Sequence, residues 1–145
     1  MKISRLLREQ PHAPNLGLLL ARITTGGLMC YLHGWSKLMA GTERWERLGS
    51  GLSDLLGLNF LSIPLGFMAS FSESIAALCL IIGWYTRPSA FLLAFTMIVA
   101  VSKKIPEGLR EAELPLLFLC LSLVLLSSGA GKWSIDYIIS QKNNR

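Results

Sequence analysis

Residues 114–126 read LPLLFLCLSLVLL, and residues 91–101 read FLLAFTMIVAV. Both stretches are apolar on every side of a helix, whereas a helix of a soluble bundle needs a polar outer face. A soluble four-helix bundle is therefore excluded, and both stretches are predicted to cross a membrane.

The composition of the whole chain supports the same class of protein. Its 145 residues are 52% hydrophobic and 16% charged, whereas a typical soluble domain carries roughly 25% charged residues. The net charge of +5 comes from basic residues in short segments between apolar runs, where they flank membrane spans. The expected partner is thus the lipid bilayer and not a nucleic acid.

Four apolar runs along the chain come close to the length of about 20 residues that a membrane span needs. The predicted spans are approximately 16–38, 63–84, 88–103 and 111–129. The short connection after Trp84 forces the second and third spans into an antiparallel hairpin. The predicted fold is all-α: an integral membrane four-helix antiparallel bundle, with residues 1–145 forming a single domain.

The longer connection between the first two spans contains a fifth helical pattern. Its apolar residues recur at helical spacing and predict a short amphipathic helix in the membrane interface; they are Trp45, Leu48, Leu52, Leu55 and Leu56. Three glycines in the same connection, Gly49, Gly51 and Gly57, are interpreted as turn positions.

An even number of spans places both termini on the same side of the membrane. The positive-inside rule slightly favours a cytoplasmic location for that side. Its basic residues are Lys2, Arg5, Arg8, Arg87, Lys132, Lys142 and Arg145, against Lys37, Arg44, Arg47, Lys103, Lys104 and Arg110 on the other.

Ionisable residues inside the spans are the first candidates for function. Each costs at least about 2.5 kcal/mol on insertion scales, so it usually has a partner or a task. At 1.5 Å per residue, Arg22 and Glu73 lie roughly 9 and 16 Å from the same side of the membrane. This depth predicts a buried ion pair between them.

A second polar cluster is predicted near the side opposite the termini. His33 and Lys37 share one face of the first span with Arg22, because their spacing follows the helical repeat. Glu111 and Glu113 begin the fourth span at the same level, and Glu113 is the candidate partner. The two clusters either line a polar cavity for a small molecule, a quinone headgroup or protons, or pin the register of the helices.

Motifs of enzymes and of cofactor sites are absent from the sequence. There is no G-x-S-x-G, H-E-x-x-H, Walker loop or C-x-x-C, and the three cysteines lie apart in apolar runs. No metal site and no covalently bound cofactor is expected. Whether the chain is an enzyme or a non-catalytic accessory subunit of an oxidoreductase stays open.

Five short motifs together resemble the DoxX family of small four-helix membrane proteins, over roughly residues 16–136. They are Arg22 with Gly26, HGWSKL at 33–38, Glu73, GWYTR at 83–87 and GAGKWSID at 129–136. The resemblance implies a bacterial inner-membrane location and an association with redox systems. Related proteins include the small subunit of thiosulfate:quinone oxidoreductase.

The resemblance and the buried charges lead to three hypotheses. The first is a subunit or accessory protein of a membrane redox system, with a polar pocket for a quinone-like or small thiol or sulfur compound. The second is a small-molecule or proton-coupled carrier, acting as a homo-oligomer. The third is a purely structural partner of other membrane or redox subunits.

Overall fold

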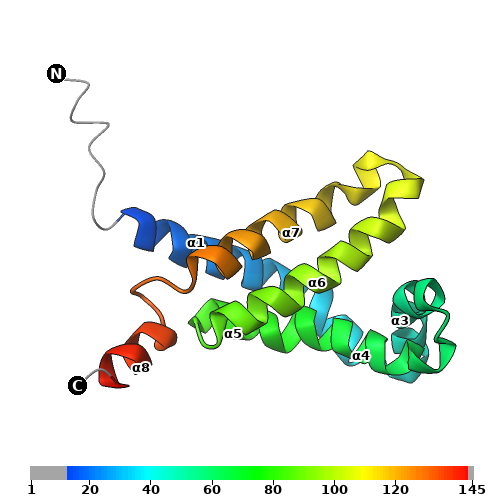
Figure 1. The fold of residues 1–145 in the computed structure, drawn as a ribbon, viewed down its shortest axis with the longest axis horizontal. Helices are drawn as coiled ribbons and strands as arrows, with labels where there is room; N and C mark the ends of the chain where they lie inside the picture. Colours follow the sequence, from blue (N-terminus) through cyan, green and yellow to red (C-terminus); the bar gives the residue numbers. More distant parts are fainter. Residues whose placement is uncertain (1–12, 144–145) are drawn as a thin grey trace.

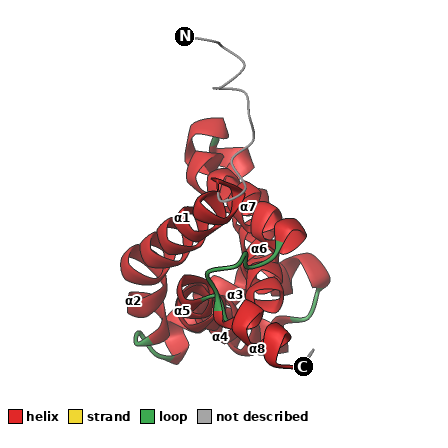
Figure 2. Cartoon of the chain, turned by 90° about the vertical axis from the view of Figure 1, so that its left-hand side faces the viewer, coloured by secondary structure: helices red, strands yellow, loops and turns green. Residues whose placement is uncertain are grey.

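The computed structural model describes residues 13–143, where every secondary-structure element is a helix and short loops join the helices (Figures 1 and 2). Four long helical rods dominate the structure, and two shorter helices complete it. The rods are α1 (Ala13–Leu28) with η2 (Met29–Gly34) and α2 (Trp35–Leu38); η3 (Asn59–Leu61) with α4 (Ser62–Phe71), η4 (Ser72–Ala76) and α5 (Ala77–Ile82); α6 (Thr86–Lys104) with η5 (Ile105–Glu107); and α7 (Leu109–Ser128). The shorter helices are α3 (Thr42–Leu56) and α8 (Ile135–Asn143).

The rods pack through small and apolar side chains in their buried middle. Helices α6 and α7 form a hairpin, α1 packs against α5 and α7, and α3 packs against α4 (Figure 1). Every rod contributes to the buried core, which consists of Met29, Cys30, Ala77, Leu80, Ala90, Leu93, Met97, Phe118 and Leu125. The all-helical class predicted from the sequence is confirmed.

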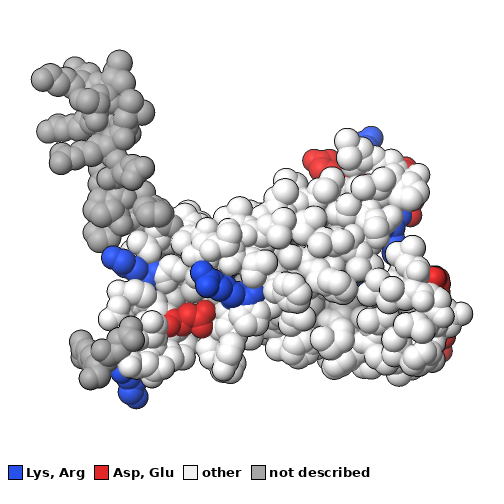
Figure 3. All heavy atoms as spheres, viewed as in Figure 1, with Lys and Arg blue, Asp and Glu red and all other residues white. Residues whose placement is uncertain are grey.

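Three helices of the described chain are long and apolar enough to cross a membrane: Asn15–Leu38, Asn59–Ile82 and Thr86–Glu107. The corresponding predicted spans are 16–38, 63–84 and 88–103. Many large apolar side chains of the rods point outward, among them Ile98, Leu117 and Leu123. On the face shown in Figure 3 the charged side chains gather at the two ends of the molecule and leave the middle uncharged. This distribution suits a lipid environment around the middle.

Helix α3 shows where two glycines were misinterpreted. Gly49 lies inside α3 and not at a turn. A Cβ at this position would overlap the backbone of Ser62, so only glycine allows α3 to approach α4 this closely. Gly51 also lies inside the helix and faces the side chain of Lys103. Only Gly57 ends the helix, with a φ of 67°. The glycines therefore allow close packing between helices, as small residues do in membrane proteins.

The C-terminal helix α8 is an element that the sequence reasoning did not predict. Asp136 in its first turn fastens it to the turn between α5 and α6. The Asp136 carboxylate accepts hydrogen bonds from the backbone N–H groups of Tyr85 at 2.8 Å and Thr86 at 2.9 Å. The Asp136 N–H donates to the Gly83 carbonyl at 2.9 Å.

The basic residues Lys2, Arg5, Arg8 and Arg145, which enter the orientation prediction, lie outside the described residues.

Candidate functional site

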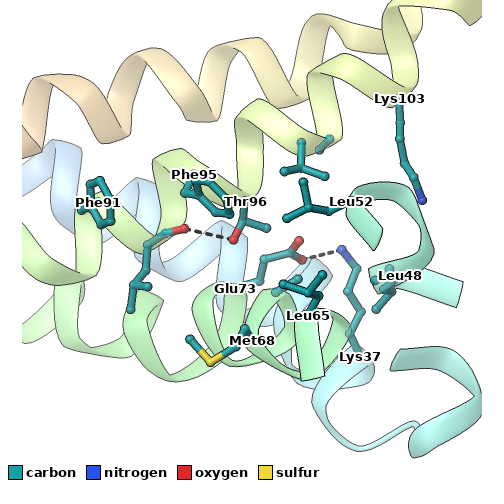
Figure 4. Close-up of a pocket in the computed structure, with 15 residues that line it drawn as sticks. Lys37, Leu48, Leu52, Leu65, Met68, Glu73, Phe91, Phe95, Thr96 and Lys103 are labelled. Carbon is teal, nitrogen blue, oxygen red and sulfur yellow. Dashed lines mark hydrogen bonds and ion pairs between the residues drawn. The ribbon is translucent and has the colours of Figure 1, made fainter. Parts of the chain in front are cut away.

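An ion pair between the partly buried Lys37 and the buried Glu73 is the centre of the candidate site. Lys37 Nζ lies 2.5 Å from Glu73 Oε2, and the two side chains are 20% and 5% exposed. Lys37 extends from α2 at the end of the first rod, and Glu73 lies in η4 in the middle of the second (Figure 4). The opposite charge compensates part of the cost of burying the Glu73 carboxylate, and removal of either partner would leave a charge unpaired.

Two π-helical segments place the pair. Segments η2 and η4 lie against each other, and Gly34 in η2 approaches the backbone of Glu73 and Ser74 so closely that a Cβ would overlap it. A π segment inserts a residue into a helix, and such insertions are frequent at functional sites. Within η4, Ser74 Oγ donates to the Ser70 carbonyl at 2.6 Å. These contacts turn Glu73 toward the first rod and the cavity beside it.

The pair lies at one wall of a cavity of about 420 Å³ between α3, α4 and α6 (Figure 4). Most of its lining is apolar, with Leu48, Leu52, Leu65, Met68, Ala69, Phe91, Leu92, Phe95, Val99 and Ala100. The charged lining residues are Lys37, Glu73 and Lys103. Ligand pockets in proteins usually have volumes of about 300–1,000 Å³ and few polar groups, so this cavity has the size of a ligand site.

A second, smaller cavity of about 90 Å³ borders the same ion pair. It contains His33, whose ring packs edge-on against Phe118 at a centroid distance of 6.2 Å. Lys37 and Glu73 line both cavities. The ion pair is therefore shared by a large apolar cavity and a small cavity with a titratable histidine.

The predicted ion pair between Arg22 and Glu73 is wrong. Arg22 is fully buried at the other end of the molecule, where its Nη2 donates to the Trp133 carbonyl at 2.5 Å. Its Nη1 lies beside Gly83. Gly83 and Glu73 are separated by roughly 15 Å of helix, beyond the reach of one side chain. The depth estimate of about 1.5 Å per residue was wrong because it assumed that Leu16 and Trp84 lie at the same height along the helices. In the structure the Arg22 side chain lies at the height of Gly83.

The predicted cluster of His33 and Lys37 with Glu113 is wrong in its acidic member. Glu113 is exposed and lines neither cavity, and Glu111 is also exposed. The carboxylate that meets Lys37 is Glu73, which α4 and η4 bring to this end of the bundle. His33 does lie beside Lys37, in the small cavity.

The sequence reasoning did not predict that two parts of the chain line the large cavity. Lys103 was counted only among the basic residues on the side opposite the termini, yet it reaches the cavity beside Gly51. Leu48 and Leu52 were found as the apolar face of an amphipathic helix, and that face closes the cavity. The helical spacing of Leu48 and Leu52 in the sequence predicts an apolar face, but it does not show what that face covers.

Fold and site together define a helical membrane protein with a buried ion pair beside an apolar cavity. The DoxX family model matches residues 17–103, more than half of the chain, and the protein belongs to the DoxX family. The matched segment contains Lys37, Glu73 and every residue that lines the large cavity. Neither the curated proteins nor the solved structures include a match to this chain.

Proposed function

We propose that this DoxX-family protein binds a quinone-like molecule in the large cavity and serves a membrane redox system as a subunit or accessory protein. The observation that carries the proposal is the Lys37–Glu73 pair at the wall of an apolar cavity of about 420 Å³. A quinone has the matching shape, with a polar ring and an apolar tail. A small thiol or sulfur compound would use the pair and leave the apolar walls uncovered.

The ion pair offers both kinds of hydrogen bond that the two redox forms of a quinone need. An ammonium group carries three donors, and Lys37 uses one of them on Glu73. The others are available to a quinone carbonyl oxygen. Glu73 Oε1 takes part in no hydrogen bond among the described residues, and a carboxylate oxygen accepts from the hydroxyl of a quinol. Oxidised and reduced ligands would thus both find partners.

The proposal places the protein in the membrane with one span more than the three long apolar helices. Helix α7, which is apolar from Leu114 to Leu126, would be the fourth span of an antiparallel bundle. Helix α3 would lie at the membrane surface and cover the cavity, with Leu55 and Leu56 exposed to lipid. The location would be the bacterial inner membrane with both termini in the cytoplasm, and a homo-oligomer or other redox subunits would complete the assembly.

Titration of purified protein in nanodiscs with decylubiquinone tests this function. Glu73→Gln, which keeps the shape of the side chain, is expected to weaken binding at least about tenfold, as removal of one partner of a buried pair does. The double variant Lys37→Met/Glu73→Gln removes both charges together and avoids an unpaired buried charge.

The matched control is the exposed ion pair between Lys104 and Glu107, at 2.6 Å. Lys104→Met/Glu107→Gln is expected to bind like the wild type, because exposed pairs contribute little. Decylubiquinone binding that survives in both Glu73 variants, with folding intact, would contradict the proposal.

A proton-coupled carrier is the second candidate, and one observation favours it. The Lys37–Glu73 pair borders two separate cavities, and His33 occupies the smaller one. A histidine close to a buried carboxylate is an arrangement that proton relays in membrane proteins use. Vesicles containing the protein would then show proton flux down a pH gradient, reduced in Glu73→Gln. Flux equal to that of empty vesicles would exclude this candidate.

A further inference from the structure

A third cavity, of about 470 Å³ and wide open to the surface, lies at the opposite end of the molecule from the ion pair, between the start of α6 and the segment that joins α7 to α8. Two cations line it: Arg87 in the first turn of α6, and Lys132 in the connecting segment. Both side chains are exposed, and neither forms an ion pair within residues 13–143. The cavity therefore presents two uncompensated positive charges from elements distant in sequence.

The backbone of the connecting segment beside these cations has a defined shape. Gly129 and Gly131 have φ values of 77° and 74°, which only glycine adopts without strain. The Lys132 N–H donates to Asn15 Oδ1 at 2.9 Å and fastens the segment to the first rod. The Arg87 guanidinium lies beside Gly129, where a Cβ would stand 3.6 Å from Nε. The open backbone leaves room next to the guanidinium.

One acidic residue also lines this cavity, and its charge is already engaged. Asp136 accepts hydrogen bonds from the N–H groups of Tyr85 and Thr86, one on each carboxylate oxygen. The positive end of the α6 dipole stabilises the same carboxylate. Its negative charge is therefore directed toward α6, and the net charge of the residues that line the cavity remains positive.

Three exposed aromatic residues lie at this end of the molecule and favour a position at headgroup depth for the cavity. Trp84, Tyr85 and Trp133 surround this end of the molecule, and each is 44% exposed or more. Tryptophan and tyrosine concentrate at the membrane–water interface because their rings are amphipathic. The apolar residues Ile138 and Ile139 of α8 are exposed at the same end.

We infer that this cavity binds a phosphate group, supplied by the headgroup of an anionic phospholipid. Arg87 offers a planar fork of donors that suits phosphate oxygens, and Lys132 adds a point charge. The hydroxyl groups of Ser128, Tyr137 and Ser140 also line the cavity and can donate to the headgroup. The site is independent of the quinone proposal, since it shares no residue with the other two cavities.

Native mass spectrometry of the full-length protein tests the inference, with phosphatidylglycerol and phosphatidylcholine added in equal amounts. The wild type is expected to retain phosphatidylglycerol in preference. Arg87→Gln/Lys132→Gln is expected to weaken its retention about tenfold or more, since both cations that attract the anionic headgroup are removed. The charge-matched control is Arg44→Gln/Arg110→Gln, two exposed residues that line none of the three cavities; it is expected to keep the preference.

A second arm distinguishes a lipid from a soluble phosphate compound. Inorganic phosphate at millimolar concentration is added before the lipid. Unchanged lipid retention supports a phospholipid as the source, whereas displacement of the lipid by phosphate supports a soluble phosphate at the same two cations. Equal retention of both lipids by the wild type, or undiminished phosphatidylglycerol binding in Arg87→Gln/Lys132→Gln, would overturn the inference. Thermal unfolding of each variant verifies that it is folded.

Discussion

Replacement of Asp136 by alanine is expected to release α8 from the bundle. The change removes the hydrogen bonds to the N–H groups of Tyr85 and Thr86, at 2.8 and 2.9 Å, and keeps the backbone bond to Gly83. A hydrogen bond to a charged group contributes about 1.5–3 kcal/mol, and the bond to Tyr85 is exposed, so the two together contribute about 2–3 kcal/mol. The open population of α8 should then rise roughly 30- to 150-fold, at about 1.4 kcal/mol for each factor of ten.

Hydrogen exchange followed by mass spectrometry measures this opening directly, because amide protection reports the free energy of local unfolding. The backbone amides of α8 should exchange faster by that factor, while those in the middle of α6 should be unaffected. Asp54→Ala is the matched control, because Asp54 is exposed and forms no ion pair among the described residues. Equal exchange of α8 in Asp136→Ala and Asp54→Ala would refute the reasoning.

Three further predictions concern the bundle and the large cavity. Arg22→Met should lower stability by about 1–3 kcal/mol, because the Trp133 carbonyl loses its donor, yet leave decylubiquinone affinity within about twofold of the wild type. Parallel unfolding and binding measurements check this, and a loss of affinity would indicate that Arg22 contributes to ligand binding. Gly34→Ala should cost about 1–3 kcal/mol, since its Cβ would overlap the backbone of Glu73, whereas Gly27→Ala, with open space at its Cβ, should cost nothing. Similar unfolding midpoints for the two variants would contradict the contact between η2 and η4. Ala69→Leu should fill part of the large cavity and weaken decylubiquinone binding roughly tenfold; unchanged affinity by titration would place the ligand elsewhere.

Local patterns in the sequence were sufficient to predict the helices and to find both members of the ion pair. Long apolar runs predict helices because a membrane leaves no other partner for the backbone. Lys37 and Glu73 stood out as charges within such runs. Their pairing was missed because the depth count assumed the wrong level for the first helix, and the π segments that bring them together leave no mark in hydropathy.

Features that depend on distant contacts were beyond that reasoning. The partner of Arg22 is a backbone carbonyl at Trp133, and no local pattern relates positions 111 residues apart. The large cavity exists because α3 folds back along α4, through the close contact of Gly49 with Ser62. Helical spacing predicted α3 itself, but the same glycine was interpreted as a turn because glycine serves both purposes.

Photolabelling with a diazirine-bearing short-chain quinone, followed by peptide mapping, tests the central claim most directly. The account predicts adducts on α3, α4 and α6 near Leu52, Ala69 and Phe95, all of which line the large cavity. Excess decylubiquinone should suppress these adducts, and Glu73→Gln should reduce them. Adducts spread over the lipid-facing sides of the helices, or labelling that decylubiquinone does not compete away, would contradict a quinone site beside Lys37 and Glu73.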